Sequence, residues 1–359
     1  MHVGTKNSSI YQAIQKIAVG PDRGRDLSRA DSRDVMRAIL DGKVDEVQTA
    51  VFLIALRMKR ESMDEFLGLF DALQEHQQSV ISDCAEVVCL AEPFDGYVRT
   101  ATVTPFIPAV LAANGIHSVM HGVRSVGPKH GVTAHKVYAA AGINVAMSLK
   151  EASGKLSSVG WSYVDQSNYA PALFALAGLR DRIVKRTALT TLERLAAPIK
   201  GRQATHLVLG YVHNAYPSIY ATVAKQAGFD SKLLLKGVEG GLAPAANKPL
   251  RRFLFDRDLP DNIDQQKELI DSDALFSAAS AAPPRLSDEN PVQECLELGL
   301  KTLSGAQGIA RDSLSLAAGQ ILFALGQATS LAKAVDNVQL CLDNGLAQAR
   351  FRTMMETAR

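Results

Sequence analysis

Cysteines are few in this 359-residue sequence, and long hydrophobic runs are missing. The four cysteines are scattered along the chain, which predicts neither a disulfide scaffold nor a zinc site. No apolar run reaches the roughly 18 residues that a membrane-spanning helix needs. The first residues also lack the short apolar core of a signal peptide. We therefore expect a cytoplasmic protein with no membrane partner, and the composition, 47% hydrophobic and 21% charged, is that of a globular protein.

The first 80 residues have the hydrophobic spacing of α-helices. One predicted helix face consists of Val47, Val51, Ile54, Ala55 and Met58. A following helix is expected to begin at Ser62, because Ser62 and Glu65 have the spacing of a capping box. This pattern predicts a small all-helical domain over residues 1–80.

A different theme begins near residue 87. An Ala-rich helical segment, a glycine and a short apolar run recur in residues 109–120, 137–147 and 223–235, and further strands are expected at 87–90 and 205–212. Helix, glycine and strand in repetition are typical of a parallel sheet. We predict an α/β fold in which residues 81–359 form an open, mainly parallel α/β sheet domain. In this domain an acidic, proline-containing loop lies near 258–300, and C-terminal helices pack back on the sheet.

Four segments of the chain resemble the anthranilate phosphoribosyltransferase family, within glycosyltransferase family 3. They are QTAVFLIALRMKRESMDEF (48–66), MHGVRS (120–125), LAAPIKGRQATHLVLGYV (195–212) and LDNGLAQARF (342–351). The resemblance covers nearly the whole chain and implies that family's fold. It also implies a homodimer formed through the helical domain, because such helices pair subunits in the family.

The sequence departs from the family at the positions that bind pyrophosphate and metal. The family's G-T-G-G-D loop is replaced by EPFDGYVRT (92–100), which keeps only Gly96 and adds Arg99. Where the family has an Asp-Glu pair for Mg²⁺, this chain has Leu242 and Ala243, with Glu239 nearby. We therefore expect the Mg²⁺ site to be lost, no certain cofactor, and little or no anthranilate phosphoribosyl transfer. The altered loop resembles a divergent branch of the family, some of whose members are homodimers that bind nucleic acid.

The resemblance and the altered loop suggest a set of residues that bind phosphate or another part of a ligand. The set is Asp95, Gly96, Arg99, Thr102, Thr104, His121, Gly122, Arg124, Lys129, Arg186 and Arg202. Several of them also have a structural interpretation. Asp95-Gly96 is an ordinary turn pair, the two threonines are candidate helix N-caps, and a histidine at position 121 serves equally as a structural hydrogen-bonding group. No catalytic residue is assigned.

Charge is distributed unevenly, although the formal net charge is only +2. Residues 99–257 hold 20 Lys and Arg against 7 Asp and Glu, and the rest of the chain holds 19 against 30. From this region we select a polyanion-binding patch made of Arg180, Arg182, Lys185, Arg186, Lys200, Arg202, Arg251 and Arg252. The alternative is that the acidic segment 258–300 neutralises these charges within the protein.

Nucleic acid is the ligand that these observations favour, because so many cations suit a long polyanion better than a small pyrophosphate. Aromatic residues near the basic stretches either stack bases or fill the core. They are Phe94, Tyr97, Trp161, Tyr163 and Tyr169. Two alternatives stay open. One is an active pentosyl- or phosphoribosyltransferase that uses phosphoribosyl pyrophosphate or another phosphorylated small molecule. The other is a regulatory or scaffold protein with a vestigial anion site.

Overall fold

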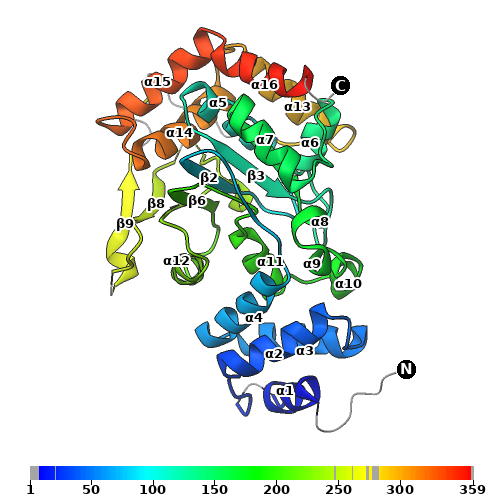
Figure 1. The fold of residues 1–359 in the computed structure, drawn as a ribbon. Helices are drawn as coiled ribbons and strands as arrows, with labels where there is room; N and C mark the ends of the chain where they lie inside the picture. The colour runs from blue at the N-terminus through cyan, green and yellow to red at the C-terminus, as the bar shows by residue number, and fades with distance from the viewer. Residues whose placement is uncertain are drawn as a thin grey trace.

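The computed structural model describes residues 8–20, 22–245, 248–260, 262–271, 275–276 and 283–356. A helical bundle forms one end of the molecule, and a sheet covered by helices on both faces forms the rest (Figure 1). This arrangement confirms the predicted fold class. No helix within the described ranges is long and apolar enough to cross a membrane.

Four helices make up the bundle in the described part of the chain. They are α1 (Ser9–Ile17), α2 (Arg29–Leu40), α3 (Glu46–Lys59) and α4 (Met63–Glu75). Helix α4 begins as predicted, because the Ser62 side chain accepts a hydrogen bond from the Glu65 amide and the Glu65 side chain accepts one from the Ser62 amide. A second capping box of the same kind, Ser28 with Asp31, starts α2.

Helix α3 buries a different face from the one that the apolar spacing suggests. Phe52, Leu53 and Leu56 point into the bundle core, whereas Val47 and Met58 are 73% and 75% exposed. The apolar stripe from Val47 to Met58 is therefore the outer face of α3. A helix with apolar residues on both faces is consistent with burial on both sides.

Seven strands form the main sheet in the order β4-β3-β2-β6-β7-β8-β9. Their bounds are β2 (Glu86–Ala91), β3 (Ser118–Gly122), β4 (Trp161–Asp165), β6 (Ala204–Gly210), β7 (Ser231–Leu235), β8 (Leu250–Phe255) and β9 (Lys267–Ile270). The first five strands in this order are parallel to one another. Strand β8 pairs with β7 in the antiparallel sense, and β9 pairs with β8 in the antiparallel sense. Two short strands, β1 (Val80–Ile81) and β5 (Ile199–Lys200), pair separately.

Each face of the sheet has its own hydrophobic core. Along β2, Val87 and Cys89 belong to the core shared with the bundle, whereas Val88 and Leu90 face the C-terminal helices. The helices on the bundle side are α8 (Gln166–Tyr169), α9 (Pro171–Phe174), α10 (Ala177–Ile183), α11 (Ala188–Leu192) and α12 (Tyr216–Gln226). Those on the other side are α5 (Ile107–Ala113), α6 (Ala134–Ala140), α13 (Pro291–Leu303), α14 (Ile309–Ala324), α15 (Leu331–Asp343) and α16 (Leu346–Glu356). Helix α7 (Leu149–Val159) packs against edge strand β4.

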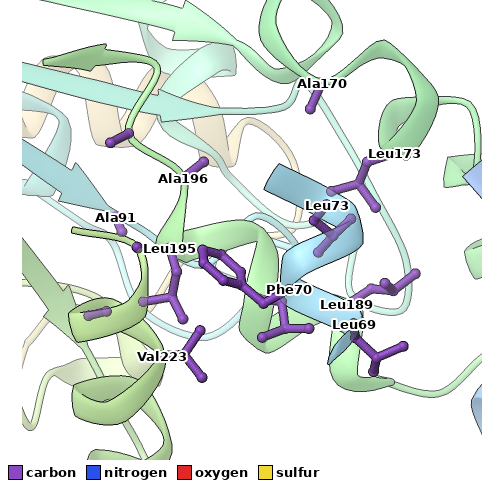
Figure 2. Close-up of a cluster of buried hydrophobic side chains, with 14 of the residues drawn as sticks. Leu69, Phe70, Leu73, Ala91, Ala170, Leu173, Leu189, Leu195, Ala196 and Val223 are labelled. Carbon is purple, nitrogen blue, oxygen red and sulfur yellow. The ribbon is translucent and has the colours of Figure 1, made fainter. Parts of the chain in front are cut away.

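The bundle is joined to the sheet domain by a continuous apolar contact (Figure 2). Helix α4 supplies Leu69, Phe70 and Leu73, and the sheet domain supplies residues such as Leu195 and Val223 from the segments near α11 and α12. Burying these side chains stabilises one arrangement of the two parts. Residues of α3 and α4 can therefore complete a site on the sheet domain.

Two of the local expectations are wrong. The apolar residues of segment 143–147 form a turn, in which the Asn144 side chain accepts a hydrogen bond from the Ala146 amide. The strand that pairs with β3 on this side is β4, and not segment 143–147. Segment 258–300 contains β9 and the start of α13, rather than being a loop throughout. Residues 261, 272–274 and 277–282 of this segment lie outside the described ranges.

A candidate anion-binding cleft

A cleft of about 740 Å³ lies between the bundle and the carboxyl ends of the parallel strands. The segments that follow β2, β3, β4, β6 and β7 all contribute to its wall, and Arg57 and Glu61 reach it from the bundle. Ligands of open α/β sheets bind at this edge of the strands. The candidate functional site is therefore this cleft.

The loop that follows β2 is shaped by Gly96. This glycine has φ +75° and packs against the backbone of residues 131–132, where a Cβ atom would lie 2.6 Å from the Val132 carbonyl oxygen. Tyr97 then pairs with Val132 as an isolated antiparallel bridge. Gly96 thus has a structural role that the sequence left open, and it sets the position of Asp95 and Arg99 on the cleft wall.

Asp95 forms the centre of an ion-pair group. Its side chain is buried, and its Oδ2 atom accepts hydrogen bonds from Arg186 Nε at 2.9 Å and Nη2 at 2.6 Å. Lys129 Nζ lies 3.5 Å from the other carboxylate oxygen. Almost half of the Arg186 side chain stays exposed, so this guanidinium faces both Asp95 and the cleft.

Glu239 is a second acidic residue in the wall, in the turn that follows β7. Its carboxylate accepts hydrogen bonds from the backbone amides of Val98 at 3.3 Å, Arg99 at 3.0 Å and Thr100 at 3.1 Å. Lys129 Nζ lies 3.4 Å from the same carboxylate, and Arg99 Nε lies 3.8 Å away. The Arg99 side chain is 79% exposed.

Arg194 is a buried residue of the cleft lining. It donates hydrogen bonds from Nη2 to the carbonyl oxygens of Ala91 at 2.8 Å and Gly240 at 3.0 Å. Its guanidinium also lies over the ring of Tyr220, 5.7 Å from the centroid. The site prediction left Arg194 out, although it belongs to the basic stretch around residues 180–202.

Aromatic residues also line the cleft, next to its cations. Tyr211, His213, Tyr216 and Tyr220 belong to this lining, and the rings of Tyr216 and Tyr220 lie 5.9 Å apart. Burial raises the pKa of Tyr211 to about 12, so its hydroxyl is protonated at neutral pH. The sequence pattern gave no indication of these four residues. The five aromatic residues that were considered for base stacking, Phe94, Tyr97, Trp161, Tyr163 and Tyr169, are all buried in the interior.

Thr102 and Thr104 point into the protein. Their hydroxyls are 2.9 Å apart, and Thr104 donates a hydrogen bond of 2.7 Å to the buried carboxylate of Glu92. Glu92 also accepts hydrogen bonds from the Tyr97 hydroxyl and the Leu242 amide, and burial raises its pKa. Neither threonine is the N-cap residue that the sequence suggested, because the short helical turn Thr104–Phe106 has Val103 at its N-cap. Neither hydroxyl faces the cleft.

His121 and Gly122 are also interior residues in this structure. The His121 side chain is 1% exposed, and its Nδ1 lies 2.9 Å from the Tyr169 hydroxyl. Burial lowers the pKa of His121 to about 3, so the imidazole is neutral near pH 7. The structural interpretation of His121 therefore fits its surroundings better than ligand contact does. Arg124 is exposed but does not line the cleft.

The eight residues of the predicted polyanion patch do not form one surface. Arg180 is buried and pairs with the buried Glu193, and Arg252 is buried and donates to Gln320 and to the half-exposed Glu268. These two arginines must be removed from the patch, because both are buried and their guanidinium groups are engaged by partners within the protein. Arg182 is exposed but pairs with Glu46 of α3 at 2.5 Å, and this pairing lowers the Glu46 pKa.

Lys185, Lys200 and Arg202 are surface residues outside the cleft lining. Lys200 and Arg202 precede β6, whereas the cleft lies after this strand. The seven residues of β6 span about 20 Å, so these two cations lie at the opposite edge of the sheet. Of the eight patch residues, Arg186 is the one that the structure places in the cleft.

Arg251 instead lines a second hollow, of about 560 Å³, on the other side of the turn that contains Glu239. Lys236 and Lys248 line the same hollow. The two hollows therefore adjoin along the carboxyl edge of the sheet, with segment 237–245 between them.

The described residues do not fit a divalent metal ion at the position of the family's acidic pair. Leu242 and Ala243 are buried and apolar, and the carboxylates of Asp95 and Glu239 are engaged by cations and amides. Within the described ranges, no group of three His, Cys, Asp or Glu residues is placed to hold a metal.

Comparison with known families gives matches to both parts of the chain. The helical bundle domain of a glycosyl transferase family matches residues 11–77, and the a/b domain of a glycosyl transferase family matches residues 96–348. The chain is 26% identical over 331 residues to an uncharacterised protein of Aquifex aeolicus, covering 92% of this chain and 98% of that protein. It is also 26% identical over 334 residues to an anthranilate phosphoribosyltransferase of Polynucleobacter necessarius, covering 93% and 94%.

Solved structures show the same architecture. Anthranilate phosphoribosyltransferase from Thermus thermophilus superposes with a TM-score of 0.76 at 19% identity, over 98% of this chain and 99% of that one. The enzyme from Saccharomyces cerevisiae in complex with PRPP and Mg superposes with a TM-score of 0.76 at 13% identity, over 98% of each chain. At these identities the likeness demonstrates the fold and leaves the ligand open.

Proposed function

Because the chain belongs to glycosyltransferase family 3, as an anthranilate phosphoribosyltransferase-like member, we propose that it uses the family's cleft to bind an anionic, phosphate-containing ligand, with nucleic acid as the best candidate. The observation that carries this proposal is that exposed cations and aromatic rings line the same cleft. Arg57, Arg99 and Arg186 lie on the cleft together with His213 and Tyr216. Single-stranded nucleic acid is bound by this combination, since cations hold the backbone and aromatic rings stack on bases.

The second hollow supports a long ligand over a small one. Lys236 and Arg251 lie beyond segment 237–245 and outside the first cleft. A single pyrophosphate is satisfied by two or three cations, so cations in two adjoining hollows suit successive phosphates of a chain. The donor set for Mg²⁺ does not fit, which supports the further proposal that the protein carries out little or no anthranilate phosphoribosyl transfer.

Fluorescence anisotropy with labelled single- and double-stranded oligonucleotides tests this function. We expect binding at low salt, with a log–log salt slope of about −0.7 for each phosphate contacted on a single strand. Absence of binding to either oligonucleotide at low salt would refute the nucleic-acid proposal.

The alternative function is phosphoribosyl or pentosyl transfer to an acceptor yet to be identified. It is supported by the match to anthranilate phosphoribosyltransferases over more than nine-tenths of the chain. Calorimetric titration with phosphoribosyl pyrophosphate and Mg²⁺ separates the two functions. A metal-dependent binding isotherm favours the transferase, and a flat trace at millimolar ligand excludes it.

We further propose a homodimer in which a second copy covers the outer face of α3. The supporting observation is the exposed apolar stripe of Val47, Val51 and Met58 on that helix, since exposed apolar stripes mark interaction sites. Light scattering should give the mass of a dimer for the purified protein. A monomer mass that persists at high protein concentration would contradict this assembly.

A further inference from the structure

Three consecutive backbone amides in the cleft wall converge on a carboxylate that belongs to the protein itself. The amides of Val98, Arg99 and Thr100 all donate to Glu239, at 3.0 to 3.3 Å. Successive amides directed at one point form an anion-binding nest, and Lys129 Nζ adds a positive charge 3.4 Å from the carboxylate. In this structure an internal anion therefore fills a nest that has the chemistry of a phosphate site.

The turn that carries Glu239 holds the carboxylate in this place. Glu239 has φ +51°, a left-handed conformation that non-glycine residues rarely adopt. The Val238 amide bonds to the Ala243 carbonyl at 3.0 Å, and Arg194 holds the Gly240 carbonyl at 3.0 Å. A Cβ atom on Gly241 would collide with the Tyr97 hydroxyl, so the turn fits tightly against the loop that it caps. The contact between Glu239 and the nest is therefore built into two loops, and its carboxylate is 3% exposed.

Repulsion between like charges explains why an incoming phosphate competes with Glu239. The Glu239 carboxylate occupies the point on which the amides converge, with Lys129 Nζ 3.4 Å and Arg99 Nε 3.8 Å away. A phosphate that reached the amides while Glu239 stayed in place would meet a like charge within contact distance, which is unfavourable. Entry of a phosphate into the nest therefore requires the Glu239 side chain to leave it.

We propose that residues 98–100 form a latent phosphate-binding site that Glu239 keeps closed by acting as an internal anion. This inference deepens the proposed anion-binding function and rests on it for the identity of the natural ligand. In the closed state, phosphate groups bind the exposed cations of the cleft, such as Arg99 and Arg186. When Glu239 is displaced or removed, the amides and Lys129 become available to a phosphoryl group.

Inorganic pyrophosphate, without metal and at fixed ionic strength, is the probe that tests the latent site. We expect the Glu239→Ala variant to bind pyrophosphate about tenfold more tightly than the native protein in calorimetric titration, because charge-assisted hydrogen bonds to the amides become available. Glu239→Gln should fall between the two, since its neutral side chain still occupies the nest. Backbone amide NMR signals of residues 98–100 should shift with pyrophosphate in Glu239→Ala and stay unshifted in the native protein.

Glu61→Ala is the matched control, because Glu61 lines the same cleft and makes no hydrogen bond to these amides. The proposal is overturned if pyrophosphate affinity is the same in Glu239→Ala and the native protein, or if Glu61→Ala raises it equally. If thermal melting shows that Glu239→Ala is unfolded, Glu239→Gly replaces it, since glycine accepts the positive φ.

Oligonucleotide binding is measured in parallel on the same proteins. This measurement distinguishes a failure of the nucleic-acid function from a failure of the latent phosphate site. If the native protein binds no oligonucleotide but Glu239→Ala gains pyrophosphate affinity, the nucleic-acid function is wrong and the latent site stands. If the native protein binds oligonucleotides but the variant gains no pyrophosphate affinity, the latent site is wrong and the function stands.

Discussion

On the cleft side of the sheet domain, Arg99 and Arg186 keep 79% and 45% of their side chains exposed, whereas Arg180 and Arg252 in the interior keep only 4% and 5%. The interior arginines make short hydrogen bonds to buried acceptors. The arginines on the cleft leave much of their side chains exposed to solvent, so their guanidinium groups can donate hydrogen bonds to a ligand. The same residue type is therefore a structural group in one region and a candidate ligand contact in the other, and burial distinguishes them.

The largest effect is expected on the interior side of this comparison. Arg180 donates two hydrogen bonds, of 2.6 and 2.7 Å, to the fully buried carboxylate of Glu193. Replacing Arg180 by Met leaves Glu193 buried without its cation, which should lower the free energy of unfolding by about 3–5 kcal/mol. Urea denaturation measures this change.

The double variant Arg180→Met, Glu193→Leu is the control for that experiment, because it removes both charges. It should recover much of the lost stability. A single Arg180→Met variant with native stability, but with weakened oligonucleotide binding, would place Arg180 back among the ligand contacts.

The next largest effect belongs to the cleft side. The double variant Arg99→Glu, Lys236→Glu reverses one cation in each of the two hollows. Oligonucleotide affinity should fall about 100-fold at low salt, and the salt slope should flatten by about 0.7 for each lost contact. Fluorescence anisotropy as a function of salt gives both quantities.

Lys200→Glu with Arg202→Glu is the matched control, since it reverses the same number of charges at the opposite edge of the sheet. At about 0.1 M salt we expect less than a threefold change in affinity for this control, because attraction between exposed charges is then screened beyond about 10 Å. Equal losses in the two double variants would show that the ligand responds to total charge and not to the cleft.

Most of the fold was predictable from the sequence because hydrophobic spacing follows burial in most elements, although α3 buries Phe52, Leu53 and Leu56 instead of its Val47–Met58 stripe. Helix, glycine and strand recur at α5–β3 and α12–β7, with Gly115 and Gly228 at the junctions in left-handed conformations. Strand β4 was missed because Trp161–Asp165 mixes aromatic, polar and apolar residues and lacks the apolar run by which the other strands were found.

The site was predictable only in part, because contacts across the chain leave no local pattern. The loop 92–100 and Arg186 were identified from the resemblance and do meet in the cleft. The contact of Glu239 with this loop joins residues about 140 positions apart and uses backbone amides, which have no sequence signature. The division of the basic residues into buried and exposed sets depends likewise on partners such as Glu193 that lie on other elements.

The smallest of the three effects separates His121 in the interior from His213 on the cleft wall. The folded-state pKa of His121 is lowered to about 3 by burial, below the usual value of 6.5. Between these two values the unfolded chain binds a proton that the folded protein does not bind, so stability rises with pH and is lost as the pH falls below about 6.5. At pH 5 this residue should lower the free energy of unfolding by about 2 kcal/mol relative to pH 7.5.

Urea denaturation of the native protein and of His121→Gln at both pH values isolates the effect, because every other titrating group is shared by the two proteins. His213, in contrast, is exposed to solvent on the cleft wall. If His121→Gln keeps the native pH dependence, His121 is protonated in the folded state, and its place among the buried structural residues is wrong.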